Sequence, residues 1–151
     1  MSGRPTHYRR PGWFTKHVVN AVVLWAARVG ISVWGSQMLE VRGRTTAVAR
    51  RTPVNPLHLG DSIYLVAPRG EAQWVRNVRA AGRLDLVLGR RRSAYVATEL
   101  ADEEKVPVLR AYLQRWKAEV GVFFDGVGPR STDAELAAIA AKHPVFTLAA
   151  P

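Results

Sequence analysis

Residues 50–82 read RRTPVNPLHLGDSIYLVAPRGEAQWVRNVRAAG and combine strand, turn and helix signals in one segment. Two apolar segments, residues 52–59 and 62–67, flank the turn signal Gly60-Asp61, so we expect two adjacent strands. A helical pattern then runs from Glu71 to Ala81 and ends at a glycine. Two strands followed directly by a helix indicate a mixed α and β domain.

The rest of the chain continues this mixed pattern. Further strands are predicted at residues 38–44, 84–88, 93–100 and 144–148. Helices are predicted at residues 13–34, at residues 102–119 with Asp102 as N-cap, and from the capping box Thr132-Asp133-Ala134-Glu135 to Lys142. Pro53 and Pro56 place the second strand at an edge or a bulge. Sequential strands with inserted helices predict an α+β fold built on an antiparallel sheet or barrel.

Composition limits the possible classes of protein. The chain has 151 residues, 48% hydrophobic and 23% charged, which fits one soluble domain over residues 13–151 after a loose basic arm at residues 1–12. It has no cysteine, so disulfides and thiolate chemistry are excluded. The four histidines lie far apart without the spacing of metal ligands, and we therefore predict no metal site.

The net charge of +10 indicates an anionic partner, because the excess of arginine is large and no acidic residue precedes Glu40. Phosphates, carboxylates, nucleic acid and a membrane surface all fit this charge. A nucleic-acid partner is disfavoured, since the aromatic residues lie on apolar stripes and no helix carries base-reading side chains.

The amino-terminal segment has two interpretations. Residues 13–34 carry apolar side chains at helical spacing and follow the basic residues Arg4, Arg9 and Arg10. The segment is too short and too interrupted to span a bilayer, and it lacks the pattern of a signal peptide. We expect a cytoplasmic protein in which residues 1–34 either touch an anionic membrane surface peripherally or pack across the barrel.

Two basic segments predict an anion site. The segment GRTTAVARRT, residues 43–52, lies between two strands, and Arg69-Gly70 precedes the helix that starts near Glu71. A helix start presents free backbone N–H groups and the positive end of the helix dipole. Arg44, Arg50 and Arg69 could therefore form an anion cradle there, and the alternative is that they are solvated arginines on exposed loops.

The order LEVRGRTTAVARRTPVNPL, then DSIYLVAPRGEAQWVRNVRAAG, then LGRR resembles the deazaflavin-dependent nitroreductase family. This family is the A branch of the flavin/deazaflavin oxidoreductases, which have a split β-barrel fold with flanking helices. The resemblance implies a reductase that uses coenzyme F420 to pass a hydride to a small hydrophobic acceptor, such as a quinone, a nitroaromatic compound or an activated alkene.

The resemblance also implies site residues. The positions that match the family's cofactor-binding motifs are Arg44, Thr45, Arg50, Pro53, Ala67, Pro68, Arg69, Gly70, Trp74 and Asn77. Phe123 and Phe124 match the region that lines the acceptor space, although both could equally be core residues of a buried turn. No side chain is assigned a catalytic role, because the cofactor carries the hydride and the protein supplies binding and orientation.

The chain departs from the family in its basic loop. That loop usually reads G-R-K-[ST]-G, whereas Thr45 replaces the lysine here and Ala47 replaces the glycine. Arg51, Arg76 or Arg79 could supply the missing charge. Two alternatives stay open, namely a non-catalytic relative that holds a fatty acid or other lipid at the membrane, and a protein that binds flavin mononucleotide (FMN). We expect a monomer or a weak dimer.

Overall fold

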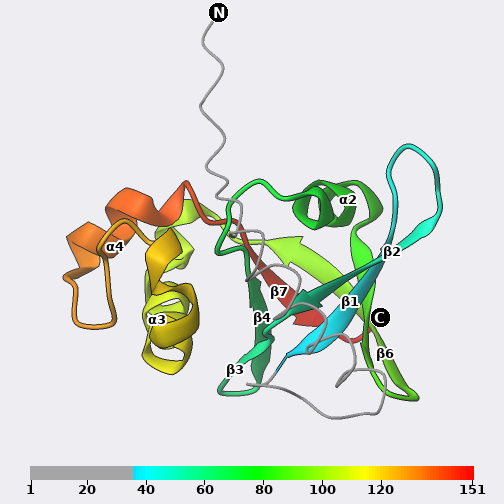
Figure 1. Ribbon diagram of the computed structural model, residues 1–151, viewed down its shortest axis with the longest axis horizontal. Coiled ribbons are helices and arrows are strands. Elements are labelled where there is room, and N and C mark those ends of the chain that lie inside the picture. Colours follow the sequence, from blue (N-terminus) through cyan, green and yellow to red (C-terminus); the bar gives the residue numbers. More distant parts are fainter. Residues whose placement is uncertain (1–35) are drawn as a thin grey trace, which may run out of the picture.

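The computed structural model describes residues 36–151, apart from the side chains of residues 117–119. The predicted arm at 1–12 and helix at 13–34 lie outside the described residues. One antiparallel sheet has the strand order β2-β1-β5-β6-β7-β4-β3 (Figure 1). The strands are β1 Gln37–Arg42, β2 Ala49–Val54, β3 Leu57–Leu59, β4 Ser62–Val66, β5 Arg83–Leu88, β6 Arg91–Glu99 and β7 Val145–Ala149.

The sheet curls into a partial barrel, which confirms the predicted α+β split-barrel class. β2 and β3 follow one another in the chain, separated only by Asn55 and Pro56, yet they form the two opposite edges of the sheet. A flat sheet could not place them so far apart in strand order with so short a connection, so its edges must approach each other. The single strand predicted at residues 52–59 was therefore wrong: Pro56 interrupts it, and its halves pair with different partners.

Three helices complete the described part of the fold: α2 (Gln73–Ala81), α3 (Val106–Val120) and α4 (Asp133–Ala140). They cover opposite faces of the sheet, as alternate residues of β4 show. Leu65 packs in one cluster with Trp74, Val75 and Val78 of α2. Its neighbour Val66 packs in another cluster, which is built on α3 and α4. None of the helices among residues 36–151 is long and apolar enough to cross a bilayer.

The helix ends agree with the sequence in two cases and differ in one. Gly82 ends α2 in the left-handed conformation with φ of 69°, and Thr132 Oγ1 accepts from the Glu135 N–H at 3.2 Å, as the capping box predicts. Asp102 is not the N-cap of the next helix. It lies in a short 3₁₀ helix, η1 (Asp102–Glu104), and its carboxylate accepts from Lys105 Nζ at 2.7 Å, so α3 begins only at Val106.

Candidate functional site

Arg44 connects the loop between β1 and β2 to α2 by hydrogen bonds. The backbone N–H of Arg44 donates to Asn77 Oδ1 at 3.2 Å, and its Nη1 donates to the same oxygen at 2.9 Å. The same Nη1 donates to Gln73 Oε1 at 2.9 Å. Asn77 is 5% exposed, so one buried amide fixes both the backbone and the guanidinium of Arg44. Gln73 was not predicted, although its place one helical turn before Asn77 puts it on the same face.

The loop itself is a tight turn. The Gly43 N–H donates to Val48 O at 2.8 Å, and the Ala47 N–H donates to Gly43 O at 2.9 Å. Ala47 has φ of +57°, a left-handed conformation that glycine adopts at no steric cost. Thr45 is exposed in this turn. A Cβ added at Gly43 would lie 3.9 Å from Cγ of Arg50, so the Arg50 side chain passes beside the base of the loop.

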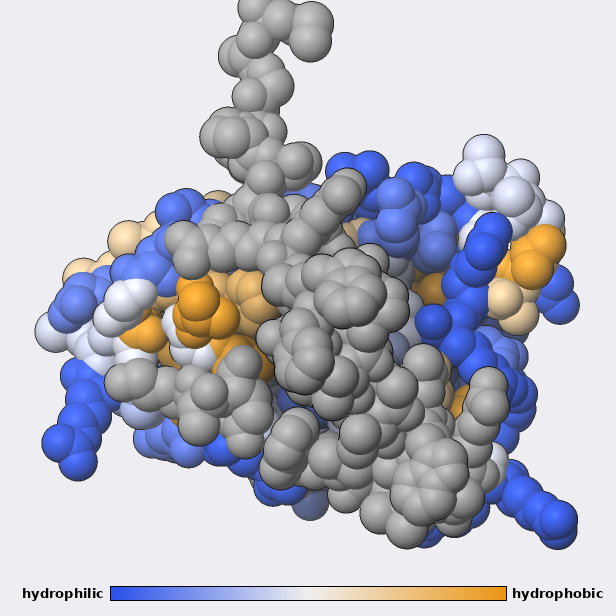
Figure 2. Space-filling view, viewed as in Figure 1, coloured by the Kyte–Doolittle hydropathy of each residue, from blue (hydrophilic) through white to orange (hydrophobic). Residues whose placement is uncertain are grey.

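The first turn of α2 has the features of an anion site. Its N-cap is Ala72, which makes no side-chain cap hydrogen bond, and no acidic residue lies in the first turn. Backbone N–H groups there are left without side-chain acceptors at the positive end of the helix dipole. Arg50 and Arg69 make no ion pair with any carboxylate of the described residues. Figure 2 shows hydrophilic residues over α2 and beside the β1–β2 loop.

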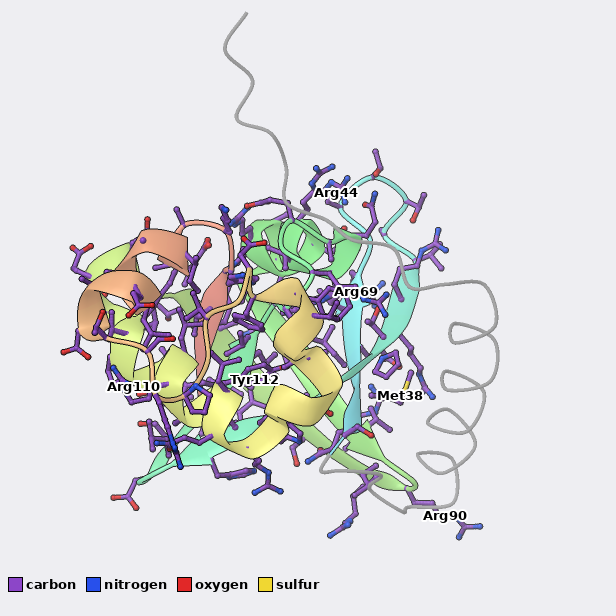
Figure 3. All side chains as sticks on the ribbon, turned by 60° about the vertical axis from the view of Figure 1, so that its left-hand side comes forward. Met38, Arg44, Arg69, Arg90, Arg110 and Tyr112 are labelled. Carbon is purple, nitrogen blue, oxygen red and sulfur yellow. The ribbon has the colours of Figure 1, made fainter. Side chains whose placement is uncertain are left out.

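Arg69 lies in the turn between β4 and α2, where the Gly70 N–H donates to Ala67 O at 3.2 Å and Gly70 has φ of 84°. Its guanidinium carbon is 5.5 Å from the ring centroid of Phe123. Arg69 therefore contacts the residue predicted to meet the acceptor. In Figure 3, Arg44 lies beside α2 and Arg69 between α2 and α3.

Phe123 and Phe124 lie in different environments. Phe123, the last residue of the 3₁₀ helix η2 (Gly121–Phe123), is half-buried. Phe124 is fully buried and stacks on His143, with ring centroids 4.1 Å apart. His143 Nδ1 donates to Ala67 O at 3.1 Å, so the buried stack is hydrogen-bonded to the start of the β4–α2 turn. Of the two interpretations, the buried-core one describes Phe124, and Phe123 stays a candidate for the acceptor space.

Trp74 and Pro53 have structural positions in the core and in the sheet. Trp74 is 8% exposed and packs against Phe146 with ring centroids 6.0 Å apart, so it orients α2 on the sheet from within the core. Pro53 lies on β2 opposite Met38.

Two of the three arginines proposed to replace the missing lysine are engaged elsewhere. Arg51 pairs with Glu40 at 2.7 Å on the sheet face opposite α2. Arg79 pairs with both Glu71 and Glu99, at 2.6 and 2.7 Å. Arg76, which is half-buried on α2, makes no ion pair with the described residues. Arg76 is therefore the remaining candidate.

Comparison with known protein families identifies the family of this chain. The model of the F420H2-dependent quinone reductase family matches residues 13–126. The chain belongs to this family. The chain is thus an F420-dependent oxidoreductase, and the resemblance predicted from the loop, turn and helix motifs is confirmed.

Solved structures agree on the fold of this reductase. It is similar to an F420H2-dependent reductase with 18% identity and a TM-score of 0.51, over 76% of this chain and 94% of the other. It is also similar to a domain-swapped dimer, with 15% identity and a TM-score of 0.55 over 90% and 97% of the two chains. A conserved hypothetical protein from Mycobacterium tuberculosis has 14% identity and a TM-score of 0.50 over 99% and 86%.

At these identities the structural likeness shows the split-barrel fold alone. The comparison with curated proteins found no match. The residues around the start of α2 fit an anionic cofactor. The helix start has no side-chain cap, Arg44 is hydrogen-bonded to it, and Arg50 and Arg69 have no carboxylate partner among the described residues.

Proposed function

We propose that this reductase holds the anionic part of coenzyme F420 between the β1–β2 loop and the first turn of α2. The observation that carries the proposal is the hydrogen bonding of Arg44 to Gln73 and Asn77. These bonds lie at a helix start that has no side-chain cap and no acidic residue in its first turn. Only Nη1 and the backbone N–H of Arg44 donate to described residues, so Nε and Nη2 stay available to an anion.

Each neighbouring residue has a distinct role in this proposal. Arg50, beside the base of the loop, and Arg69, in the β4–α2 turn, add charge-assisted donors. Gly70 lets the backbone turn sharply into the helix, since its φ of 84° suits glycine. Bound there, the coenzyme would supply the hydride, and the protein would supply binding and orientation.

We further propose that the acceptor is a quinone or another small hydrophobic molecule, such as a nitroaromatic compound or an activated alkene. The half-buried ring of Phe123 supports an apolar acceptor, and its contact with Arg69 links that ring to the cofactor turn. Phe124 does not meet the acceptor in this proposal, because it is fully buried.

Spectroscopic titration with F420, and separately with FMN, tests the cofactor site. We expect binding of F420 to the wild type, and about tenfold weaker binding in Arg50→Ala and in Arg69→Ala, because each loses a charge-assisted contact worth roughly 1.5–3 kcal/mol. Affinity should fall with salt. Arg130→Ala is the matched control, since Arg130 is an exposed arginine that precedes α4 and forms no ion pair with the described residues. Unchanged affinity in both site variants would remove these arginines from the site.

A peripheral contact with anionic membranes through residues 1–34 is the last part of the proposal. These residues lie outside the described part of the chain, so the membrane proposal rests on the sequence. No acidic residue precedes Glu40, and arginines stand before an apolar segment of helical spacing. Such a contact would bring the reductase close to a quinone dissolved in lipid.

A further inference from the structure

The sheet opens between β1 and β5. Pairing of these strands ends at Glu40 and Asp85. Yet β1 stays paired with β2 as far as Arg42, and β5 stays paired with β6 back to Arg83. The two hairpins therefore run apart beyond Glu40 and Asp85. Figure 1 shows the β1–β2 loop standing out from the rest of the sheet.

This opening holds a cavity of about 590 Å³, within the usual size range of small-molecule sites. Its walls are mainly apolar, from Val41, Leu84 and Tyr95 among others, and Arg42 and Arg83 line it at the diverging strand ends. An apolar wall with a few charged groups is the usual make-up of a site for a small organic molecule.

The charge of the cavity favours an anion. Two arginines neutralise the two acidic side chains that line it: Arg92 Nη1 donates to both Glu40 and Asp85, at 2.8 and 2.7 Å, and Arg51 also pairs with Glu40. Within the described part of the chain, Arg42 donates only to a backbone carbonyl, Ala47 O, at 3.0 Å. Arg83 makes no side-chain hydrogen bond or ion pair within residues 36–151. Two guanidinium groups thus have no counter-charge among residues 36–151.

The cavity shares no lining residue with the proposed cofactor site, although Arg42 and Ala49 flank the β1–β2 loop. The cofactor site lies at Gln73, the first residue of α2, whereas the cavity is lined by Ala81, the last residue of the same helix. Ala81 follows Gln73 by eight positions, which is about 12 Å along the helix axis. The end of α2 near the cavity carries the negative pole of the helix dipole, which favours a cation such as Arg83 there and does not attract an anion as the start of the helix does.

We propose that the opening between β1 and β5 is a second binding site, which takes a small amphipathic organic anion. The apolar or aromatic body of this anion packs against Leu84 and Tyr95, and its carboxylate or sulfonate pairs with Arg83 and Arg42. The inference does not depend on coenzyme F420, because none of these residues belongs to the proposed cofactor site.

Fluorescence titration with 8-anilinonaphthalene-1-sulfonate, an aromatic sulfonate that brightens in apolar surroundings, tests the site. We expect saturable binding to the folded protein, weakened about tenfold in Arg83→Ala and restored in part in Arg83→Lys. Arg90→Ala is the matched control, since Arg90 projects from the tip of the β5–β6 hairpin (Figure 3). Saturating F420 should leave the titration unchanged.

Two results would overturn the second site. One is unchanged probe affinity in both Arg83→Ala and Arg42→Ala. The other is displacement of the probe by F420, which would place the probe in the cofactor site. Arg83→Ala should also keep the wild-type affinity for F420, which shows that the variant is folded. A protein that binds the probe but not F420 would contradict the proposed function and leave the second site standing.

Discussion

Ala47 departs from the family motif, and its backbone conformation is strained. It stands where the family has glycine, and its φ of +57° lies in the left-handed region. For a residue with a Cβ this conformation costs roughly 1–2 kcal/mol. The turn nevertheless closes, with hydrogen bonds between Gly43 and Val48 and between Ala47 and Gly43. The loop therefore keeps the shape that a glycine would have, at some cost in stability.

Replacing Ala47 by glycine should stabilise the protein. Relief of the left-handed strain outweighs the added freedom of the unfolded chain, and we expect a gain of about 1 kcal/mol, or a rise in Tm of about 2–4 °C. Thermal unfolding measures it. Ala138→Gly in α4 is the matched control and should lower Tm, because glycine is a poor helix former. A lower Tm for Ala47→Gly would show that the loop conformation is not strained.

Thr45 is the second departure, and it is exposed beside Arg44. If the missing lysine has lowered cofactor affinity, Thr45→Lys should restore one phosphate contact and tighten F420 binding severalfold, with a steeper dependence on salt. Titration at two salt concentrations measures both effects. Thr46→Lys, one position along the same loop, controls for a general gain in charge. Unaltered or weaker binding would mean that another cation, with Arg76 the first choice, already fills that place.

The arginines show how far sequence alone predicts the site. The pattern of two strands, a basic loop and a helix start indicated Arg44, Arg50 and Arg69, and the structure joins Arg44 to α2. The sequence could not show that Arg50 and Arg51 lie on opposite faces of the sheet. The pairing register puts Arg50 opposite the buried Val41, and it puts Arg51 opposite its ion-pair partner Glu40, on the other face of the sheet. Register and long-range pairing decide this, and neither is a local property of the chain.

Among the elements, the strands β2, β1, β5 and β6 are joined by ion pairs on the sheet face opposite α2. Glu40 accepts from Arg92 and Arg51, and Arg92 also pairs with Asp85. The hydrogen bonds from Arg92 and then Arg51 hold the pKa of Glu40 below its ordinary value of 4.5. A carboxylate with a lowered pKa in the folded state stabilises the fold above its unfolded pKa, and this contribution is lost as the pH falls.

Substitution of Glu40 by glutamine should therefore have an effect that depends on pH. At pH 7 we expect Glu40→Gln to be less stable than the wild type by about 1 kcal/mol, given that its partners are partly exposed. The difference should shrink as the pH falls below about 4.5, since the wild-type carboxylate then takes up its proton. Denaturant unfolding from pH 7 to pH 3 measures it. Glu103→Gln, at an exposed site, should show no such trend.

The elements themselves were predicted well where local signals are strong. Gly82 and the Thr132 capping box end and begin helices as expected, because capping depends on residues next to each other in the chain. The split of residues 52–59 into β2 and β3 was not predicted, since only the closure of the barrel shows that Pro56 separates two edges. The prediction of Asp102 as an N-cap was wrong, because the chain forms the 3₁₀ helix η1 there. Ala101 is the N-cap of η1, and its N–H donates to the Glu104 side chain.

At the scale of the whole molecule, the charge is distributed unevenly along the chain. The net charge is +10, and all the acidic residues lie at or after Glu40. Every cofactor residue proposed above lies after Gly43. Deleting the basic amino-terminal segment therefore removes none of the proposed cofactor residues, so a truncated protein can test delivery to a membrane apart from hydride transfer.

Deletion of residues 1–16 should abolish sedimentation with anionic vesicles and leave reduction of a water-soluble quinone intact. Basic residues near an anionic surface contribute on the order of 1 kcal/mol each, so the wild type should bind vesicles at low salt and leave them at high salt. Reduction of a lipid-dissolved quinone should fall in the truncated protein, because it no longer reaches the acceptor. The full-length variant in which Arg4, Arg9 and Arg10 become glutamine should behave in the same way. Wild-type protein that stays in the supernatant at low salt would contradict the membrane proposal and leave the split-barrel reductase with a soluble acceptor.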